Sequence, residues 1–235
     1  MIKSVIDNHG KQILDFMQTA GHYNKWILQL ITPYLTGDII EIGSGTGNFT
    51  AMISRKNSRL TATDYNRDYL SLLQKHFPKL QTFYFDLESP RIPMALNQKF
   101  DTAICLNVLE HIANESVALK NIFDTLKPGG KLIISVPAFK FAFGRVDRSL
   151  GHIRRYTQKS LKNSLIRQGF TVISCRYINF LGLWGWWFNT KILKRNTIYL
   201  WQIRLFEIFS RPFLFLENYL PAPMGISVFS LARKP

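Results

Sequence analysis

Short apolar segments alternate with helical stretches along most of this chain, and this alternation constrains the fold more than any other feature. Strands are expected at 38–42, 60–64, 82–86, 101–107 and 131–136, with helices over 49–55, 67–76 and 114–126. Strands joined by helices pair in parallel through right-handed crossovers. The pattern therefore predicts a doubly wound α/β domain with a mostly parallel sheet.

The regular alternation is bounded by helices at one end and by a different pattern at the other. Two amphipathic helices, 2–18 and 23–35, are expected before the first strand. After Pro137 we expect a basic and aromatic loop to Tyr156, a helix over 158–168 and strands at 170–177 and 226–232, which brings the sheet to seven strands. The segment between the last two strands is too long for a structureless loop in a compact domain, so a helical insertion is expected there. We predict one domain over 1–235, with N-terminal helices (1–36), core (37–177), basic aromatic cap (178–224) and last strand (225–235).

Positive charge is concentrated in the second part of the chain. The formal net charge is +15; residues 140–235 hold 16 Lys and Arg against 3 Asp and Glu, whereas residues 1–139 hold 14 against 12. Such a one-sided field favours an anionic partner, either a phospholipid surface, a nucleic acid or a phosphorylated substrate. A solvated basic face without a specific partner is the alternative.

Cysteine usage and the first residues bear on location. Cys105 and Cys175 lie in apolar runs, which is typical of buried thiols in a reducing compartment. The segment from Met1 to Asp7 lacks the apolar stretch of a signal peptide. We expect a cytoplasmic protein, with peripheral contact to the inner membrane face as an additional option.

A glycine cluster follows the first expected strand. Residues 39–47 are I-I-E-I-G-S-G-T-G, so glycines at alternate positions stand between a strand and a helix, where a ligand can approach the backbone and a helix N-terminus can receive an anionic group. The dinucleotide fingerprint G-x-G-x-x-G does not fit, because its third glycine falls on Asn48 or Thr50. Glu41 is an acid inside the strand, and burial of an acid requires a donor or a cation, such as the ammonium group of a methionine-type cofactor.

The run E-I-G-S-G-T-G over 41–47 resembles the first motif of class I S-adenosylmethionine-dependent methyltransferases. Further matching segments follow in order: Asp64 and Asp86 end the second and third strands, N-V-L-E-H-I spans 107–112, and L-K-P-G-G-K-L spans 126–132. The resemblance implies S-adenosyl-L-methionine as cofactor, bonding of its ribose by Asp64 and a place beside its adenine for Asp86. A helix-capping role for Asp64 and a turn role for Asp86 are the alternatives. The implied cofactor-binding residues are Glu41, Gly43, Ser44, Gly45, Gly47, Asp64, Tyr65, Asp86, Leu87 and Asn107.

The segment after the fifth strand is expected to face the methyl acceptor. Residues 147–157, D-R-S-L-G-H-I-R-R-Y-T, resemble the D-x-x-L-G-H-x-R-R-Y stretch of a bacterial subgroup of small-molecule methyltransferases. Loops at the carboxyl ends of such strands form the ligand crevice. A hydroxyl acceptor must lose its proton, and imidazole titrates near neutral pH, so His152 is the predicted catalytic base. Tyr156 is the second catalytic candidate, where it would form a wall of the pocket; capping of the next helix is the alternative.

Further residues of this region are predicted to bind the acceptor, the arginines through a phosphate or carboxylate. In the alternative interpretation, His152 and the arginines hold the loop by bonding Asp147 and backbone carbonyls. No metal site is predicted. The predicted acceptor-binding residues are His111, Arg148, Arg154, Arg155 and Trp184.

The expected cap combines aromatic, apolar and basic residues. Residues 178–188 are strongly apolar but too few to span a bilayer. A helix beginning near 198 is expected to place Arg204, Glu207 and Arg211 on one face. Its opposite face would carry Trp201, Leu205, Ile208 and Phe209. Such a segment is either a lid over an apolar acceptor pocket or an interfacial membrane element.

These features predict S-adenosylmethionine-dependent methyl transfer, by in-line displacement, to a small, apolar or lipid-like acceptor at oxygen or nitrogen. One alternative is an RNA or protein methyltransferase that uses the basic C-terminal half. Nucleic acid is disfavoured because the basic region is apolar and aromatic, and because the fourth strand ends in N-V-L-E, without the proline pair typical of enzymes that methylate base amino groups. The other alternative is a non-catalytic, membrane-associated cofactor-binding module.

Overall fold

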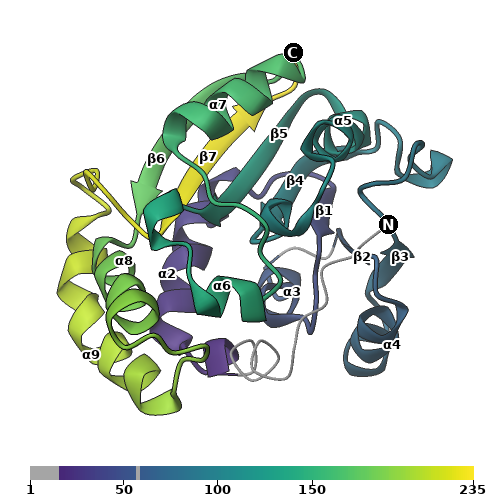
Figure 1. Ribbon diagram of the computed structural model, residues 1–235. Helices are drawn as coiled ribbons and strands as arrows, with labels where there is room; N and C mark the ends of the chain where they lie inside the picture. The colour runs from purple at the N-terminus through teal and green to yellow at the C-terminus, as the bar shows by residue number, and fades with distance from the viewer. Residues whose placement is uncertain (1–15, 57–58) are drawn as a thin grey trace.

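The computed structural model describes residues 16–56 and 59–235 (Figure 1). A seven-stranded sheet has the order β3-β2-β1-β4-β5-β7-β6, in which β7 runs antiparallel to both neighbours and the other pairs are parallel. This confirms the predicted fold class. The strands are β1 Ile39–Ile42, β2 Leu60–Asp64, β3 Gln81–Tyr84, β4 Phe100–Leu106, β5 Leu126–Pro137, β6 Thr171–Ile178 and β7 Ser227–Arg233.

Helices lie on both faces of the sheet, and successive strand residues feed two separate cores. Ile39, Ile104 and Ile133 pack into a cluster with residues of α2 and α3, whereas Ile40 and Leu132 join a cluster with residues of α5 and α7. Strands buried on both faces are apolar at consecutive positions, which is why they could be located in the sequence. The helices are α2 Gly21–Ile31, α3 Asn48–Ser54, α4 Arg67–His76, α5 Glu115–Thr125, α6 Arg145–Ser149, α7 Gln158–Arg167, α8 Phe180–Trp187 and α9 Leu200–Leu216.

Some boundaries differ from the sequence-based expectation. The first predicted helix, 2–18, lies almost entirely outside the described residues. Helix α2 ends at Ile31 and continues only as a 3₁₀ turn, Thr32–Tyr34, which contains Pro33. Strand β5 begins five residues before the predicted start, because Leu126 already pairs with Phe100. The segment from Pro137 to Tyr156 was predicted to be a loop and instead contains α6.

The insertion before β7 is helical, as predicted. It comprises α8, a π turn at Phe188–Ile192 and α9, and α9 packs against both α2 and α8 (Figure 1). Glu217, just after α9, accepts hydrogen bonds from the backbone N–H groups of Asn179 (2.7 Å) and Phe180 (2.8 Å). Glu207 accepts from the N–H groups of His22 (2.7 Å) and Tyr23 (3.0 Å). The Glu207 carboxylate thus binds the N-terminus of α2, a contact that the spacing with Arg204 and Arg211 along α9 does not indicate.

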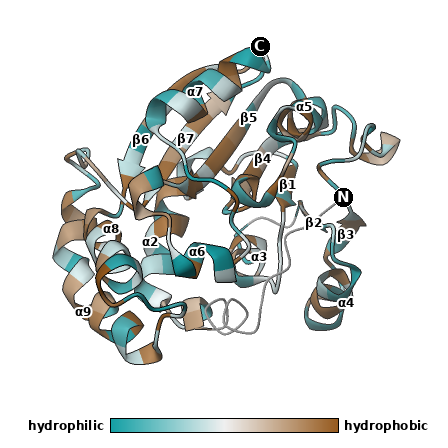
Figure 2. Ribbon diagram, in the orientation of Figure 1, coloured by the Kyte–Doolittle hydropathy of each residue, from teal (hydrophilic) through white to brown (hydrophobic). Residues whose placement is uncertain are grey.

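The apolar residues predicted along one side of α9 face outward. Trp201, Leu205, Ile208 and Phe209 are 55%, 45%, 60% and 62% exposed. Figure 2 shows apolar residues distributed along both α8 and α9. Within the described part of the chain, no helix combines the length and apolarity needed to cross a bilayer.

Candidate active site

The loop after β1 leaves open space at one of its glycines. Gly43, Gly45 and Gly47 all have positive φ angles, of 70°, 53° and 89°. A Cβ atom on Gly43 would collide with Val108, and one on Gly47 would collide with Leu73, so both glycines are needed for packing. A Cβ atom on Gly45 would meet nothing within 4 Å. The backbone at Gly45 is therefore the part of this loop that a ligand can approach closely.

Asp64, at the end of β2, fixes the glycine loop. One carboxylate oxygen accepts from the N–H of Gly45 (2.9 Å) and the other from the N–H of Asn66 (2.8 Å). Asp64 is buried, and burial raises the pKa of its carboxyl. The neighbouring Tyr65 is 46% exposed. Asp64 thus holds the loop in the conformation that leaves the space at Gly45 accessible to a ligand. This structural role is additional to its predicted role in binding ribose.

Glu41 is a buried acid beneath the same loop. Its Oε2 accepts a hydrogen bond from the Thr50 hydroxyl in α3 (2.5 Å). Burial raises the pKa of Glu41 to about 7, even though Thr50 and Ser44 act in the opposite direction. A cation beside this carboxylate would favour its ionised form.

The remaining predicted cofactor residues lie at the ends of β3 and β4. Asp86 accepts from the N–H of Glu88 (3.1 Å), and Leu87 is buried. Asn107 has a left-handed backbone (φ 55°), is exposed and donates its N–H to the carbonyl of Ser135 (2.9 Å). Because β3, β2, β1 and β4 are consecutive in the sheet, the structure brings the predicted cofactor residues to one edge, at the carboxyl ends of the strands.

A second group of polar residues surrounds the fully buried carboxylate of Asp147 in α6. One oxygen is 2.9 Å from Nδ1 of His152 and accepts from Nε of Arg155 (2.7 Å). The other accepts from the N–H of Gly144 (2.8 Å) and from Nε1 of Trp186 (3.3 Å). Burial alone would raise the pKa of Asp147, but His152 and Arg155 hold it below its usual value. Sequence reasoning did not include Trp186 or Asp147 among the site residues.

Two histidines and a glutamate meet just beyond β4. Glu110 and His111 lie in a 3₁₀ turn, Leu109–His111, and the ring of His152 packs edge-on against that of His111, with centroids 4.9 Å apart. Oε1 of Glu110 is 3.8 Å from Nε2 of His152. Burial raises the pKa of Glu110 to about 7; burial and the neighbouring His152 lower that of His111 to about 4. Glu110 is also absent from the predicted site, although its position beside His111 in the motif was a usable signal.

Of the predicted loop arginines, two bind protein groups. The Arg155 side chain is 1% exposed and, besides Asp147, donates to the carbonyl of Ala138 (2.8 Å). Arg154 donates to the carbonyl of Ala113 (2.8 Å) and lies 3.4 Å from a carboxylate oxygen of Glu115. For these two arginines, the geometry favours the interpretation in which they hold the loop.

Tyr156 and Trp184 both pack against neighbouring protein groups. Tyr156 is buried, with its hydroxyl 3.4 Å from the carbonyl of Leu109, and burial raises its pKa. This favours a supporting role for Tyr156. Trp184 is 41% exposed and contacts the rings of Phe180 and Trp187, so its ring packs along its own helix.

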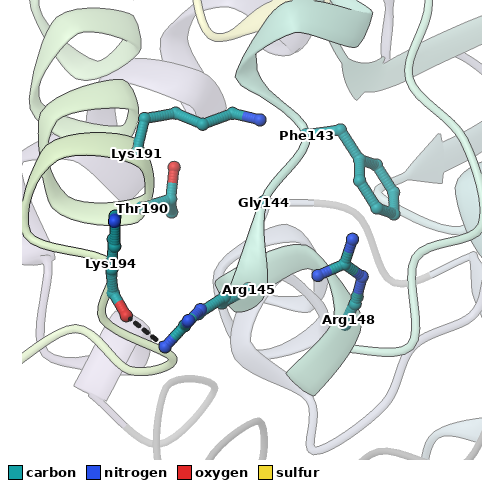
Figure 3. Close-up of a pocket in the computed structure, with 7 residues that line it drawn as sticks. All are labelled: Phe143, Gly144, Arg145, Arg148, Thr190, Lys191 and Lys194. Carbon is teal, nitrogen blue, oxygen red and sulfur yellow. Dashed lines mark hydrogen bonds between the residues drawn. The ribbon is translucent and has the colours of Figure 1, made fainter.

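A basic cavity of about 280 Å³ lies between α6 and the turn that follows α8 (Figure 3). Arg148 is exposed at this cavity, and its guanidinium lies 5.9 Å from the centre of the Phe143 ring. Arg145 donates to the carbonyl of Lys194 (3.0 Å), which joins the two walls. The cavity is lined by Phe143, Gly144, Arg145, Arg148, Thr190, Lys191 and Lys194, a set with four cationic side chains and no acid.

Known proteins are similar in sequence to part of this chain. It is 33% identical over 156 residues to a ubiquinone/menaquinone biosynthesis C-methyltransferase of Wigglesworthia glossinidia brevipalpis, a match that covers 60% of this chain and 62% of that one. It is 27% identical over 113 residues to a ubiquinone biosynthesis O-methyltransferase of Coxiella burnetii, covering 47% of each chain. The matches thus span about half to three fifths of these relatives.

Solved structures share the fold. A crystal structure of an S-adenosylmethionine-dependent methyltransferase from Mesorhizobium loti superposes with a TM-score of 0.60 at 18% identity, over 90% of this chain and 98% of that one. The family described as a methyltransferase domain matches residues 17–175. Because that match covers most of the chain, including the glycine loop, Asp64 and Asp147, this chain belongs to the methyltransferase-domain family.

Proposed function

We propose that this enzyme transfers the methyl group of S-adenosylmethionine to a small, lipid-like acceptor, at oxygen or nitrogen. In this proposal the cofactor lies over Gly45, with its ribose on Asp64, its adenine beside Asp86 and its ammonium group near Glu41. The open space at Gly45 supports this placement. The reaction is an in-line displacement, so the remaining task of the protein is to orient the acceptor and to receive its proton. His152 stays the predicted base for a hydroxyl acceptor.

The observation that carries the acceptor class is the exposed apolar side of α9 together with the basic cavity. Apolar residues such as Ile208 and Phe209 are more than half exposed, and Arg204 and Arg211 are exposed among them. A helix of this kind lies at a membrane interface, with apolar side chains in the acyl boundary and cations at the anionic head groups. The two bacterial relatives are named for quinone biosynthesis, which is consistent with an acceptor that partitions into lipid.

We further propose that the enzyme reaches this acceptor by docking α9 on an anionic phospholipid surface. The region from 140 to 235 carries 16 basic and 3 acidic residues, so its charge complements such a surface. The outward orientation of Trp201, Leu205, Ile208 and Phe209 favours interfacial contact over a lid that buries these side chains. Arg145, Arg148, Lys191 and Lys194 would accommodate an anionic group of the acceptor or of a lipid.

Replacement of Gly45 by alanine tests the cofactor site. The positive φ angle costs ~1–2 kcal/mol of stability for an alanine, and the added methyl group occupies the space assigned to the cofactor. We expect at least a tenfold loss of S-adenosylmethionine and S-adenosylhomocysteine affinity in calorimetry. Gly185→Ala is the matched control, because a Cβ atom there also meets nothing within 4 Å. Equal affinity in the Gly45 variant and the wild type would place the cofactor elsewhere.

The raised pKa of Glu41 predicts a pH-dependent gain of stability in the Glu41→Gln variant. Between pH 4.5 and about 7 the folded wild-type chain still holds a proton on Glu41 that the unfolded chain has released. The free energy of unfolding of the wild type therefore falls as the pH rises through this range. Glutamine still accepts from Thr50 and cannot ionise. We expect that, without cofactor, the free energy of unfolding of the variant is about 3 kcal/mol higher than that of the wild type at pH 8 and nearly equal to it at pH 4.5. Urea unfolding at both pH values measures this difference. A constant difference across this range would contradict the assignment.

The acceptor class is tested by following a labelled methyl group. The enzyme is incubated with methyl-labelled S-adenosylmethionine and a cell extract separated into lipid, water-soluble, RNA and protein fractions. We expect enzyme-dependent label in the lipid fraction, and at least tenfold less with the Gly45→Ala variant at a cofactor concentration well below saturation. Label in RNA or protein would favour the alternative methyltransferase function, and label in no fraction would favour a non-catalytic module.

Membrane docking is tested by cosedimentation with phospholipid vesicles. We expect binding to vesicles with 30% phosphatidylglycerol that weakens as salt is added, because salt screens the basic residues. The double variant Ile208→Ser/Phe209→Ser should bind at least tenfold more weakly than the wild type. The control variant Ile166→Ser removes a 51% exposed isoleucine from α7 and should bind like the wild type. Absence of wild-type binding, or equal binding by the double variant, would refute the docking surface.

A further inference from the structure

Three side chains that could ligate a metal converge beyond the end of β4. One ligand atom from each of Glu110, His111 and His152 lies within 4.8 Å of the others. Glu110 and His111 come from the turn directly after the fourth strand, and His152 comes from the segment between α6 and α7. The group therefore lies at the sheet edge that carries the predicted cofactor residues, beside the segment 150–157 between α6 and α7, which we call the acceptor loop.

The Glu110 carboxylate is buried without a hydrogen bond in the described part of the chain. The residue is 0% exposed, and among the residues that the structure describes neither of its oxygens has a hydrogen-bond partner. Its distance of 3.8 Å from Nε2 of His152 is too long for a hydrogen bond. A buried carboxylate without compensation is costly, so such a group normally pairs with a cation or a donor.

Both histidines are held with Nε2 available. Nδ1 of His152 lies 2.9 Å from a carboxylate oxygen of Asp147, and Nδ1 of His111 lies 3.2 Å from the carbonyl of Gly151. Those oxygens only accept, so each Nδ1 carries the hydrogen and, in the neutral ring, each Nε2 keeps its lone pair. A carboxylate or carbonyl behind the distal nitrogen is the arrangement that orients histidine ligands in metal sites.

We propose that Glu110, His111 and His152 bind a divalent transition-metal cation. Two imidazoles and one carboxylate suit Zn²⁺, Mn²⁺, Fe²⁺ or Co²⁺ and disfavour Mg²⁺, which prefers oxygen ligands. Two ligands that are each ~2.1 Å from one zinc ion lie roughly 3.4 Å apart, so the Glu110–His152 pair is already near that spacing.

The three protein ligands leave coordination positions for another molecule. If the proposed function holds, a hydroxyl oxygen of the acceptor would occupy one of them, the cation would lower the pKa of that hydroxyl, and its proton would pass to solvent water before methyl transfer. Nε2 of His152 would then be a metal ligand, and this role replaces its predicted role as the base. Metal binding itself does not depend on the identity of the acceptor.

Calorimetric titration of the full-length, chelator-treated protein with Zn²⁺, Mn²⁺, Co²⁺ and Mg²⁺, without cofactor or acceptor, tests this site. We expect one Zn²⁺ or Co²⁺ per chain, with visible absorption bands of Co²⁺ bound to nitrogen ligands and much weaker Mg²⁺ binding. Glu110→Gln and His111→Gln should each lower Zn²⁺ affinity at least tenfold, and His76→Gln, which changes an exposed histidine of α4, should not. Circular dichroism verifies that each variant folds.

The outcomes separate this inference from the proposed function. Absence of transition-metal binding by the wild type, or binding that Glu110→Gln leaves unchanged, would overturn the metal site even if methyl transfer to lipid is observed. Stoichiometric binding lost in Glu110→Gln and His111→Gln would support the site even if no lipid is labelled.

Discussion

The region between β5 and α8 is organised around one buried charge, the carboxylate of Asp147. Its donors come from three segments: Gly144 at the start of α6, His152 and Arg155 in the acceptor loop, and Trp186 in the cap. A buried carboxylate is costly unless it is compensated, and the guanidinium of Arg155 supplies the opposite charge. Because one group satisfies all three segments, the loop, the short helix and the cap cannot take up their positions independently.

The strands and the glycine loop after β1 could be predicted because their signals are local. Strands buried on both faces leave continuous apolar runs, and glycines with positive φ must follow β1 where Val108 and Leu73 leave no room for a Cβ atom. The place of Asp64 could be predicted because it ends a strand that is recognisable by itself. What the sequence did not indicate is that Asp64 also holds the Gly45 amide, since that contact joins two loops.

The contacts around Asp147 and in the cap could not be predicted in the same way, because each polar residue there is defined by partners in other segments of the chain. Arg155 looks like an anion-binding residue in the motif, yet Asp147 and a backbone carbonyl occupy its guanidinium. Glu207 has the helical spacing of a surface residue beside Arg204 and Arg211, yet it binds the N-terminus of α2, 184 residues earlier in the chain. Periodicity identifies the face of a helix, but it does not identify which neighbour that face meets.

The glycine-loop region and the region around Asp147 are connected where the chain leaves β4. The backbone there explains why the two histidines lie next to the sheet edge that carries the predicted cofactor residues. The left-handed conformation of Asn107 ends the strand and starts the short turn that carries Glu110 and His111. The acceptor loop is then bonded to this turn, since the N–H of Ile153 donates to the carbonyl of Glu110 (2.9 Å). The position of His152 is thus fixed from one side by this backbone bond next to it and from the other by Asp147. A group held from two directions has little freedom to adapt to its ligand, so the acceptor or cation must fit the geometry that the protein has already formed.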